Sequence, residues 1–299
     1  MMKRIFLYLM IVAITGSCAE NKSIDKKTYL KEFENWRMQR IKRLKADNGW
    51  LNLVGLYWLH PGENTFGSDS SDDIVFPGKA PAIAGKFVLT DSIVTMDVNK
   101  GVQIFHDKLP VKNMELTNDN SNKPTILKMG SLVWFVIKRE NRYGIRLRDL
   151  ESPVVKQLDS IPAFPADPGW AIEATFKPFK TPEVFKVATV IGTKEDYVVP
   201  GELVFKVNGK HCKLLPSKEG DGFFIVFADE TTGTETYPSG RFLYTPLPEG
   251  NNKVLIDFNK AYNPPCAFTP YATCPMPPRQ NFLPVAITAG EKTIHPGHF

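Results

Sequence analysis

The length of this chain, 299 residues, suits one large domain or two of ordinary size. Hydrophobic residues make up 42% and charged residues 23%, so a wholly disordered chain is excluded. The formal net charge of +5 is too small to indicate a nucleic-acid partner, and the 24 prolines and 21 glycines favour many short elements joined by turns.

The first residues have the pattern of a secretory signal peptide. Lys3 and Arg4 form a short positive region, and an uninterrupted apolar run over residues 5–14 follows. As a helix this run would be about 15 Å long, about half the hydrocarbon core of a bilayer, so it is too short for a stable span. We therefore predict that residues 1–17 are a signal peptide.

A cysteine follows the predicted signal peptide directly. Thr15, Gly16 and Ser17 precede Cys18, and small residues before a cysteine resemble the lipobox of bacterial lipoproteins, although Leu is usual where Thr15 stands. The resemblance implies lipidation at Cys18, a polar tether over residues 18–27 and a location in the cell envelope, lipid-anchored and facing the periplasm or the exterior. An ordinary secretory peptide cleaved nearby is the alternative.

A helix is predicted over residues 27–46. Its apolar positions recur at spacings of three and four residues, and the turn residues 47–49 end it. We expect the apolar stripe to pack against an edge of the core. A helix on the membrane surface is the alternative, because basic residues would form one of its faces near the anchor.

The rest of the chain has a β pattern, with short apolar segments separated by turns every eight to twelve residues. Asn208-Gly209 between two such segments is a strong hairpin signal. The predicted fold class is mostly β: an N-terminal helix followed by two antiparallel β modules, each a sandwich or barrel. The predicted divisions are a helix and first module over 28–152, a proline-rich linker over 153–169 and a second module over 170–299.

The first module resembles a forkhead-associated sandwich over about residues 60–150. Residues 65–68, 73–76 and 85–89 match the spacing of strands and turns in that fold. Such domains bind phosphothreonine with an arginine after the glycine, whereas Ser68 follows Gly67 here. Without a guanidinium to pair a phosphate, phosphopeptide binding is not expected.

A longer resemblance covers about residues 36–291. It is carried by the segment Gly49–Leu59, by Arg146, Arg148 and Asp149, and by motifs over residues 227–291. On these residues the chain is similar to a bacterial family known only as domain of unknown function 1684, whose members are often lipoproteins. The resemblance implies no established activity, so any chemistry has to be argued from the residues.

Polar side chains are dense between residues 229 and 263, where loops join predicted strands and binding residues commonly collect. The candidate binding or catalytic residues are Asp229, Thr231, Thr236, Tyr237, Arg241, Asp257, Asn259, Tyr262 and Asn263. Local turn hydrogen bonds are an equally weighted alternative for Asp229 and Thr231. We expect Arg241 and Asp257 to pair across a hairpin, and Arg146, Arg148 and Asp149 are secondary candidates.

Three cysteines follow the predicted lipidation site. Cys266 and Cys274 enclose seven residues and are predicted to form a disulfide in an extracytoplasmic compartment. Cys212 lies in a predicted strand and is expected to be buried. The histidines and cysteines show no H-x-x-x-H or C-x-x-C spacing, so no metal site is predicted, and no nucleotide motif indicates a cofactor.

The function that the sequence favours is a binding or envelope-associated module with a polar site in its C-terminal part. Its expected partners are the membrane, through the lipid anchor, and an unknown small polar ligand or envelope component, with no nucleic acid. The alternative is a hydrolase-like enzyme that acts on a small polar or envelope substrate through the same residues. A Cys–His pair, a Ser–His–Asp triad or a pair of carboxylates would then carry the chemistry.

Overall fold

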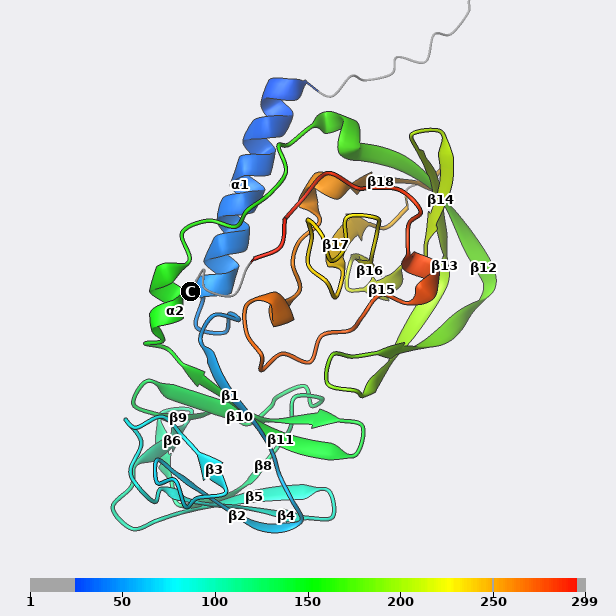
Figure 1. Ribbon diagram of the computed structural model, residues 1–299. Helices are drawn as coiled ribbons and strands as arrows, with labels where there is room; N and C mark the ends of the chain where they lie inside the picture. The colour runs from blue at the N-terminus through cyan, green and yellow to red at the C-terminus, as the bar shows by residue number, and fades with distance from the viewer. Residues whose placement is uncertain (1–24, 249, 295–299) are drawn as a thin grey trace, which may run out of the picture.

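The computed structural model describes residues 25–248 and 250–294, and over this part the chain is mostly β, as the sequence predicted (Figure 1). The predicted signal peptide and Cys18 lie outside the described residues. One long helix precedes two β bodies: an N-terminal β body (residues 53–149) and a C-terminal β body (residues 171–294). Within the described part, no helix combines the length and apolar character that crossing a bilayer requires.

Helix α1 (Lys26–Lys45) confirms the helix that the apolar spacing predicts. The Asp25 side chain caps it by accepting a hydrogen bond from the Thr28 backbone N–H at 2.9 Å. Tyr29, Phe33 and Leu44 are buried against the C-terminal β body. Arg40 is also buried, although it is one of the basic residues on which the membrane-surface alternative depends.

The N-terminal β body consists of two sheets that pack around one core. The six-stranded sheet has the order β1-β11-β10-β9-β6-β7 and the five-stranded sheet has the order β3-β2-β4-β5-β8. All neighbouring strands are antiparallel except β2 and β3. Phe66, Phe87 and Trp134 fill the centre of the core. The strands are β1 (Leu53–Trp58), β2 (Gly62–Gly67), β3 (Ile74–Val75), β4 (Gly85–Thr90), β5 (Ile93–Val98), β6 (Ile104–His106), β7 (Leu109–Val111), β8 (Asn113–Leu116), β9 (Leu127–Met129), β10 (Leu132–Arg139) and β11 (Arg142–Asp149).

The segment between the two bodies contains short helices. They are α2 (Pro153–Gln157) and the 3-10 helix η1 (Pro168–Trp170). Leu158 and Ile161 are buried with Leu44 of α1, so this segment packs against the helix while it connects the bodies. The division of the chain at this segment stays a prediction.

The C-terminal β body is built from a four-stranded sheet, β14-β13-β12-β18, and a three-stranded sheet, β15-β16-β17. Asn208 and Gly209 between β13 and β14 have φ values of 49° and 78°, which confirms the hairpin that this dipeptide predicts. After β18 the chain runs over the open side of the body with little regular structure (orange to red in Figure 1). The elements are β12 (Ala171–Ala188), β13 (Lys194–Val207), β14 (Lys210–Leu214), β15 (Ser217–Glu219), β16 (Gly222–Phe227), β17 (Arg241–Pro246), β18 (Lys253–Asp257), η2 (Phe258–Lys260), η3 (Pro265–Ala267) and η4 (Arg279–Asn281).

Candidate functional site

Arg241 is fully buried and belongs to a closed ion pair. Its Nη2 donates to Asp229 Oδ2 at 2.8 Å and to the Ile287 carbonyl at 3.1 Å, and its Nη1 donates to the Ala289 carbonyl. Neither side chain of the pair is exposed. Asp229 also accepts from the Thr231 backbone N–H at 2.8 Å and from its hydroxyl at 2.6 Å. This pair holds the loop after β16 to the last segment of the chain and leaves no room for a ligand.

The predicted pairing of Arg241 with Asp257 is wrong. Arg241 begins β17, which pairs with β16, whereas Asp257 ends β18, which pairs with β12 in the other sheet. The two strands therefore form no hairpin. Asp257 instead accepts from the Tyr29 hydroxyl at 2.8 Å and faces Lys260 at 3.1 Å, and Asn259 donates to the same hydroxyl at 2.7 Å. This cluster fastens α1 to the C-terminal β body.

Most of the other candidates also make structural bonds. The Asn263 backbone N–H donates to Glu291, which pairs with Arg40 of α1 at 3.2 Å. Thr231 and Thr236 share a hydrogen bond of 3.0 Å between their hydroxyls. Thr236 and Tyr237 border a hollow of about 660 Å³ that contains no charged side chain among its lining residues.

Two of the three secondary candidates are likewise bonded within the protein. Arg148 donates to Asn52 Oδ1 at 2.8 Å and to the Gly49 carbonyl, and Asp149 pairs with Lys79 at 2.9 Å. Of the predicted residues, Arg146 and Tyr262 line a large cleft with charged walls.

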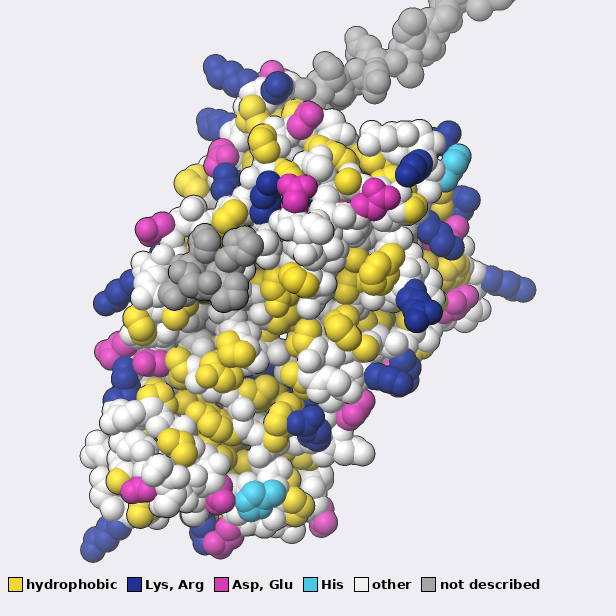
Figure 2. All heavy atoms as spheres, in the orientation of Figure 1, with side chains coloured by type: hydrophobic (Ala, Val, Ile, Leu, Met, Phe, Trp, Pro, Cys, Tyr) yellow, Lys and Arg dark blue, Asp and Glu magenta, His cyan; other side chains and the backbone are white. Residues whose placement is uncertain are grey.

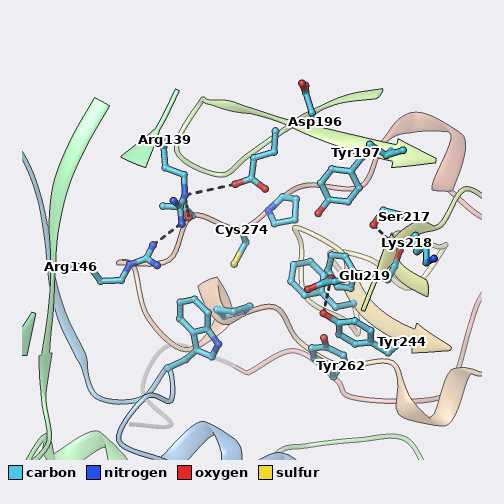
Figure 3. Close-up of a pocket in the computed structure, with 18 of the residues that line it drawn as sticks. Arg139, Arg146, Asp196, Tyr197, Ser217, Lys218, Glu219, Tyr244, Tyr262 and Cys274 are labelled. Atoms are coloured by element: carbon cyan, nitrogen blue, oxygen red, sulfur yellow. Dashed lines mark hydrogen bonds and ion pairs between the residues drawn. The ribbon is translucent and has the colours of Figure 1, made fainter. Parts of the chain in front are cut away.

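A cleft of about 650 Å³ lies where the two β bodies meet (Figure 3). Side chains reach it from α1, from β10 and β11 of the N-terminal body, and from β13, β15, β16 and β17 of the C-terminal body. On the face that Figure 2 shows, hydrophobic side chains gather near the middle of the molecule and charged ones lie mainly around them. Its lining residues include Arg40, Trp50, Arg139, Arg146, Glu195, Asp196, Tyr197, Lys218, Glu219, Phe224, Tyr244, Tyr262 and Cys274.

Arg146 dominates one end of the cleft. It is 4% exposed, its Nη2 donates to Thr273 Oγ1 at 3.3 Å, and its Nε has no hydrogen-bond partner. No carboxylate of the described residues forms an ion pair with it, and its closest aromatic contact is Trp50, 5.6 Å from the guanidinium to the ring centre. Burial, with nearby Arg139 adding to it, lowers the pKa of Arg146 to about 10, so the side chain stays charged at neutral pH.

Arg139 differs from Arg146 because it has counter-ions. It contacts Asp119 at 2.8 Å and Glu195 at 3.9 Å, and its Nε shares the Thr273 hydroxyl with Arg146 at 3.2 Å. Burial raises the pKa of Glu195. Arg139 therefore has two carboxylates within ion-pair distance, whereas the neighbouring Arg146 has none among the described residues (Figure 3).

Tyrosines form the opposite end of the cleft. The rings of Tyr244 and Tyr262 are parallel within 8°, with centres 6.4 Å apart, and Phe224 packs on Tyr244 at 4.9 Å. Tyr197 faces the same space from β13 (Figure 3). The side-chain hydroxyl of Tyr244 donates to Glu219 at 2.9 Å.

Cys274 lies on the cleft wall and Cys266 lies beside it. Both are free cysteines in the structure, so the predicted disulfide is not seen, although the Cys266 backbone N–H donates to Cys274 Sγ at 3.2 Å. Hydrogen bonding between the two thiols lowers the pKa of Cys266 and raises that of Cys274. Cys212 is buried.

Sequence reasoning missed Arg139, Tyr197 and Tyr244. They lie on three strands that are far apart in the chain, and no short motif joins them. The sequence signal that did indicate the cleft was Arg-x-Arg at residues 146 and 148. Alternation along a strand puts both of these side chains on one face of the sheet.

The comparisons with known proteins concern mainly the second half of the chain. The family model described as protein of unknown function (DUF1684) matches residues 156–292, so the match begins later than the predicted resemblance. No curated protein matches the chain.

Solved structures add weak likenesses. An uncharacterized protein of Haloarcula marismortui, solved by NMR, is 31% identical and covers 46% of this chain and 78% of its own, with a TM-score of 0.39. The FHA domain of FhaA, in complex with the intracellular domain of another protein, is 12% identical, covers 31% of this chain and 97% of its own, and has a TM-score of 0.23. A second FHA domain, from a study of phosphothreonine-dependent interactions, covers 92% of its own chain with the same identity and TM-score. By the match to its model, residues 156–292 of the chain belong to the DUF1684 family of proteins of unknown function.

Proposed function

We propose that this protein is an exported, lipid-anchored binding protein whose cleft between the two β bodies binds a small anionic ligand. The observation that carries the proposal is the state of Arg146. Its guanidinium is buried, charged and without a carboxylate partner among the described residues. A buried charge without a counter-ion is costly, and a bound anion would supply the missing partner.

The geometry supports a ligand site better than a structural role for Arg146. Two other arginines at the cleft, Arg40 and Arg139, each have a carboxylate within 3.2 Å, and so does the fully buried Arg241. The chain therefore provides counter-ions for these three arginines. Arg146 and Arg148 have none among the described residues, but Arg148 donates to Asn52 and the Gly49 carbonyl, whereas Arg146 lines a cavity of the size that small-molecule sites have.

The ion pairs and hydrogen bonds of the charged residues that the sequence predicted as a site favour binding over hydrolysis. Asp229, Asp257 and Arg241 were the charged groups assigned to an active site, and each is bonded to other side chains or to the backbone. Glu195, whose pKa burial raises, is held beside Arg139 at 3.9 Å.

The experiment that tests the proposal is a calorimetric titration with sulfate, which stays ionised across the neutral pH range. The wild-type protein should show saturable binding, and Arg146→Gln should weaken it about 30-fold, because a hydrogen-bonded charge pair contributes about 2 kcal/mol. Arg142→Gln is the matched control, since Arg142 lies on the same strand but is exposed and packs on Trp58. Equal sulfate affinity in the wild type and Arg146→Gln would overturn the proposal, and so would the absence of saturable binding.

Export and anchoring are supported by the apolar run and by Cys18 in the sequence. Changing Cys18 to alanine should release the protein from the membrane fraction or leave an uncleaved precursor, because the thiol that would carry the lipid is lost. Fractionation followed by mass spectrometry measures both outcomes. Cys266→Ser is the matched control and should stay in the membrane fraction. A normally processed Cys18→Ala protein that remains on the membrane would contradict the anchor.

An oxidising compartment should join Cys266 to Cys274, because the backbone of one residue already contacts the sulfur of the other. The bridge would close a short loop and add under about 3 kcal/mol. Peptide mapping of unreduced protein from the envelope should show this linked pair and a free Cys212. Two free thiols that persist after treatment with a mild oxidant would show that the pair does not bond.

A further inference from the structure

We infer that the anionic ligand is a sugar ring that carries a carboxylate, with the carboxylate on Arg146 and the ring against the tyrosines at the opposite end of the cleft. This inference rests on the proposed function and names the class of ligand. Three observations carry it: the free guanidinium edge of Arg146, the exposed aromatic wall and the tyrosine hydroxyls that lack partners.

The guanidinium of Arg146 is a free donor at one end of the cleft. Arg40 pairs with Glu291, Arg139 with Asp119, and Asp196 with Lys186. At the rim, the exposed side chains of Lys218 and Glu219 follow each other in β15 and carry opposite charges. Among these arginines, Arg146 alone contacts no carboxylate of the described residues, and its free Nε leaves a guanidinium edge that the two oxygens of a carboxylate can accept from.

The aromatic wall offers a flat surface of a size suited to a six-membered ring. Tyr244 is 48% exposed, and its ring is held from behind by Phe224 at 4.9 Å and from the side by the parallel ring of Tyr262. Phe224 and Tyr244 are directly opposite each other in β16 and β17, so the hydrogen bonds between the two strands fix the position of this aromatic platform. Aromatic faces with a polar edge suit ligands that are apolar on one face and hydrophilic around the rim, as sugar rings are.

The hydroxyl groups favour a ligand rich in hydrogen-bonding groups over a plain aromatic acid. Among the described residues, the hydroxyls of Tyr197 and Tyr262 have no hydrogen-bond partner, and both residues line the cleft. Glu219 already accepts from Tyr244 and has remaining acceptor capacity. A benzoate-like ring would cover these groups without satisfying them, whereas the hydroxyls of a sugar can bond to each.

The test compares four ligands on the full-length protein by calorimetry: D-glucuronate, D-glucose, acetate and benzoate. Wild-type protein should bind glucuronate at least about tenfold more tightly than each of the other three, because only glucuronate combines a carboxylate for Arg146 with a hydroxylated ring for the tyrosines. Equal affinity for glucuronate and acetate, or tighter binding of benzoate, would overturn the sugar assignment. If sulfate binding is still lost in Arg146→Gln, the proposed function survives that failure.

Variants at the aromatic wall give an independent check. Tyr244→Ala removes the platform and should abolish the preference for glucuronate over acetate, whereas Tyr197→Phe keeps a ring and should reduce glucuronate affinity about threefold to tenfold by removing one hydroxyl. Arg142→Gln is again the control and should bind glucuronate as the wild type does. Thermal melts confirm that each variant is folded. Wild-type glucuronate affinity in folded Tyr244→Ala protein would show that the wall does not hold the ring.

Discussion

Replacing Arg241 with leucine should lower the free energy of unfolding by about 3–5 kcal/mol, the largest loss expected from a single substitution among the candidate residues. The change leaves the Asp229 carboxylate without its counter-charge at a position where its side chain is 0% exposed. The remaining donors to Asp229, from Thr231 and the Ile287 backbone, cannot supply a positive charge. Urea denaturation measured by tryptophan fluorescence gives the difference directly.

Two further variants show whether the loss comes from the stranded carboxylate. In Arg241→Leu combined with Asp229→Leu, part of the stability should return, because no buried charge is left unpaired. Arg279→Leu, at an exposed arginine of the same body, should change stability by less than about 0.5 kcal/mol. Wild-type stability in the single Arg241→Leu variant would mean that the pair is solvated in solution.

Replacing Arg146 with leucine should have the opposite effect on the free energy of unfolding. In the absence of an anion the variant should be as stable as the wild type or more stable by about 1–3 kcal/mol, because it removes a desolvated charge and an unpartnered Nε without stranding a carboxylate. The comparison between Arg146→Leu and Arg241→Leu thus separates an arginine kept for a ligand from one kept for the fold.

The same denaturation experiment in the presence of sulfate provides the second half of this prediction. Sulfate should stabilise the wild type more than Arg146→Leu, and the difference should grow with concentration as linkage requires, since general salt effects act on both proteins alike. A loss of 3 kcal/mol or more in Arg146→Leu without anion would identify Arg146 as a structural residue and remove the main support for the proposed function.

The predictions that succeeded depended on local signals. The spacing of Phe33 and Leu44 identifies α1, and Asn208-Gly209 identifies a hairpin, because a helix face and a tight turn depend on residues that are near one another in the chain. The mostly β fold class could be predicted for the same reason, because short apolar segments and turns are local features of the sequence.

The predictions that failed concerned partners far apart in sequence. The choice of Asp229 over Asp257 as the partner of Arg241 depends on which sheet β18 joins, and nothing in the local pattern of β17 or β18 specifies that. The cleft was equally hidden, since its walls come from strands of both β bodies. Arg146 was noticed through its motif, but its lack of a counter-ion becomes visible only when every neighbouring element is in place.

The cleft lies between the two β bodies, and this position affects how the protein unfolds. Arg146 belongs to one β body and Tyr244 to the other, so a ligand that touches both would be lost when either body opens. Occupancy would then make the two halves melt together in one transition, whereas the empty protein would be free to melt in two. Calorimetric cooperativity, more than the melting temperature itself, would report that the cleft is filled.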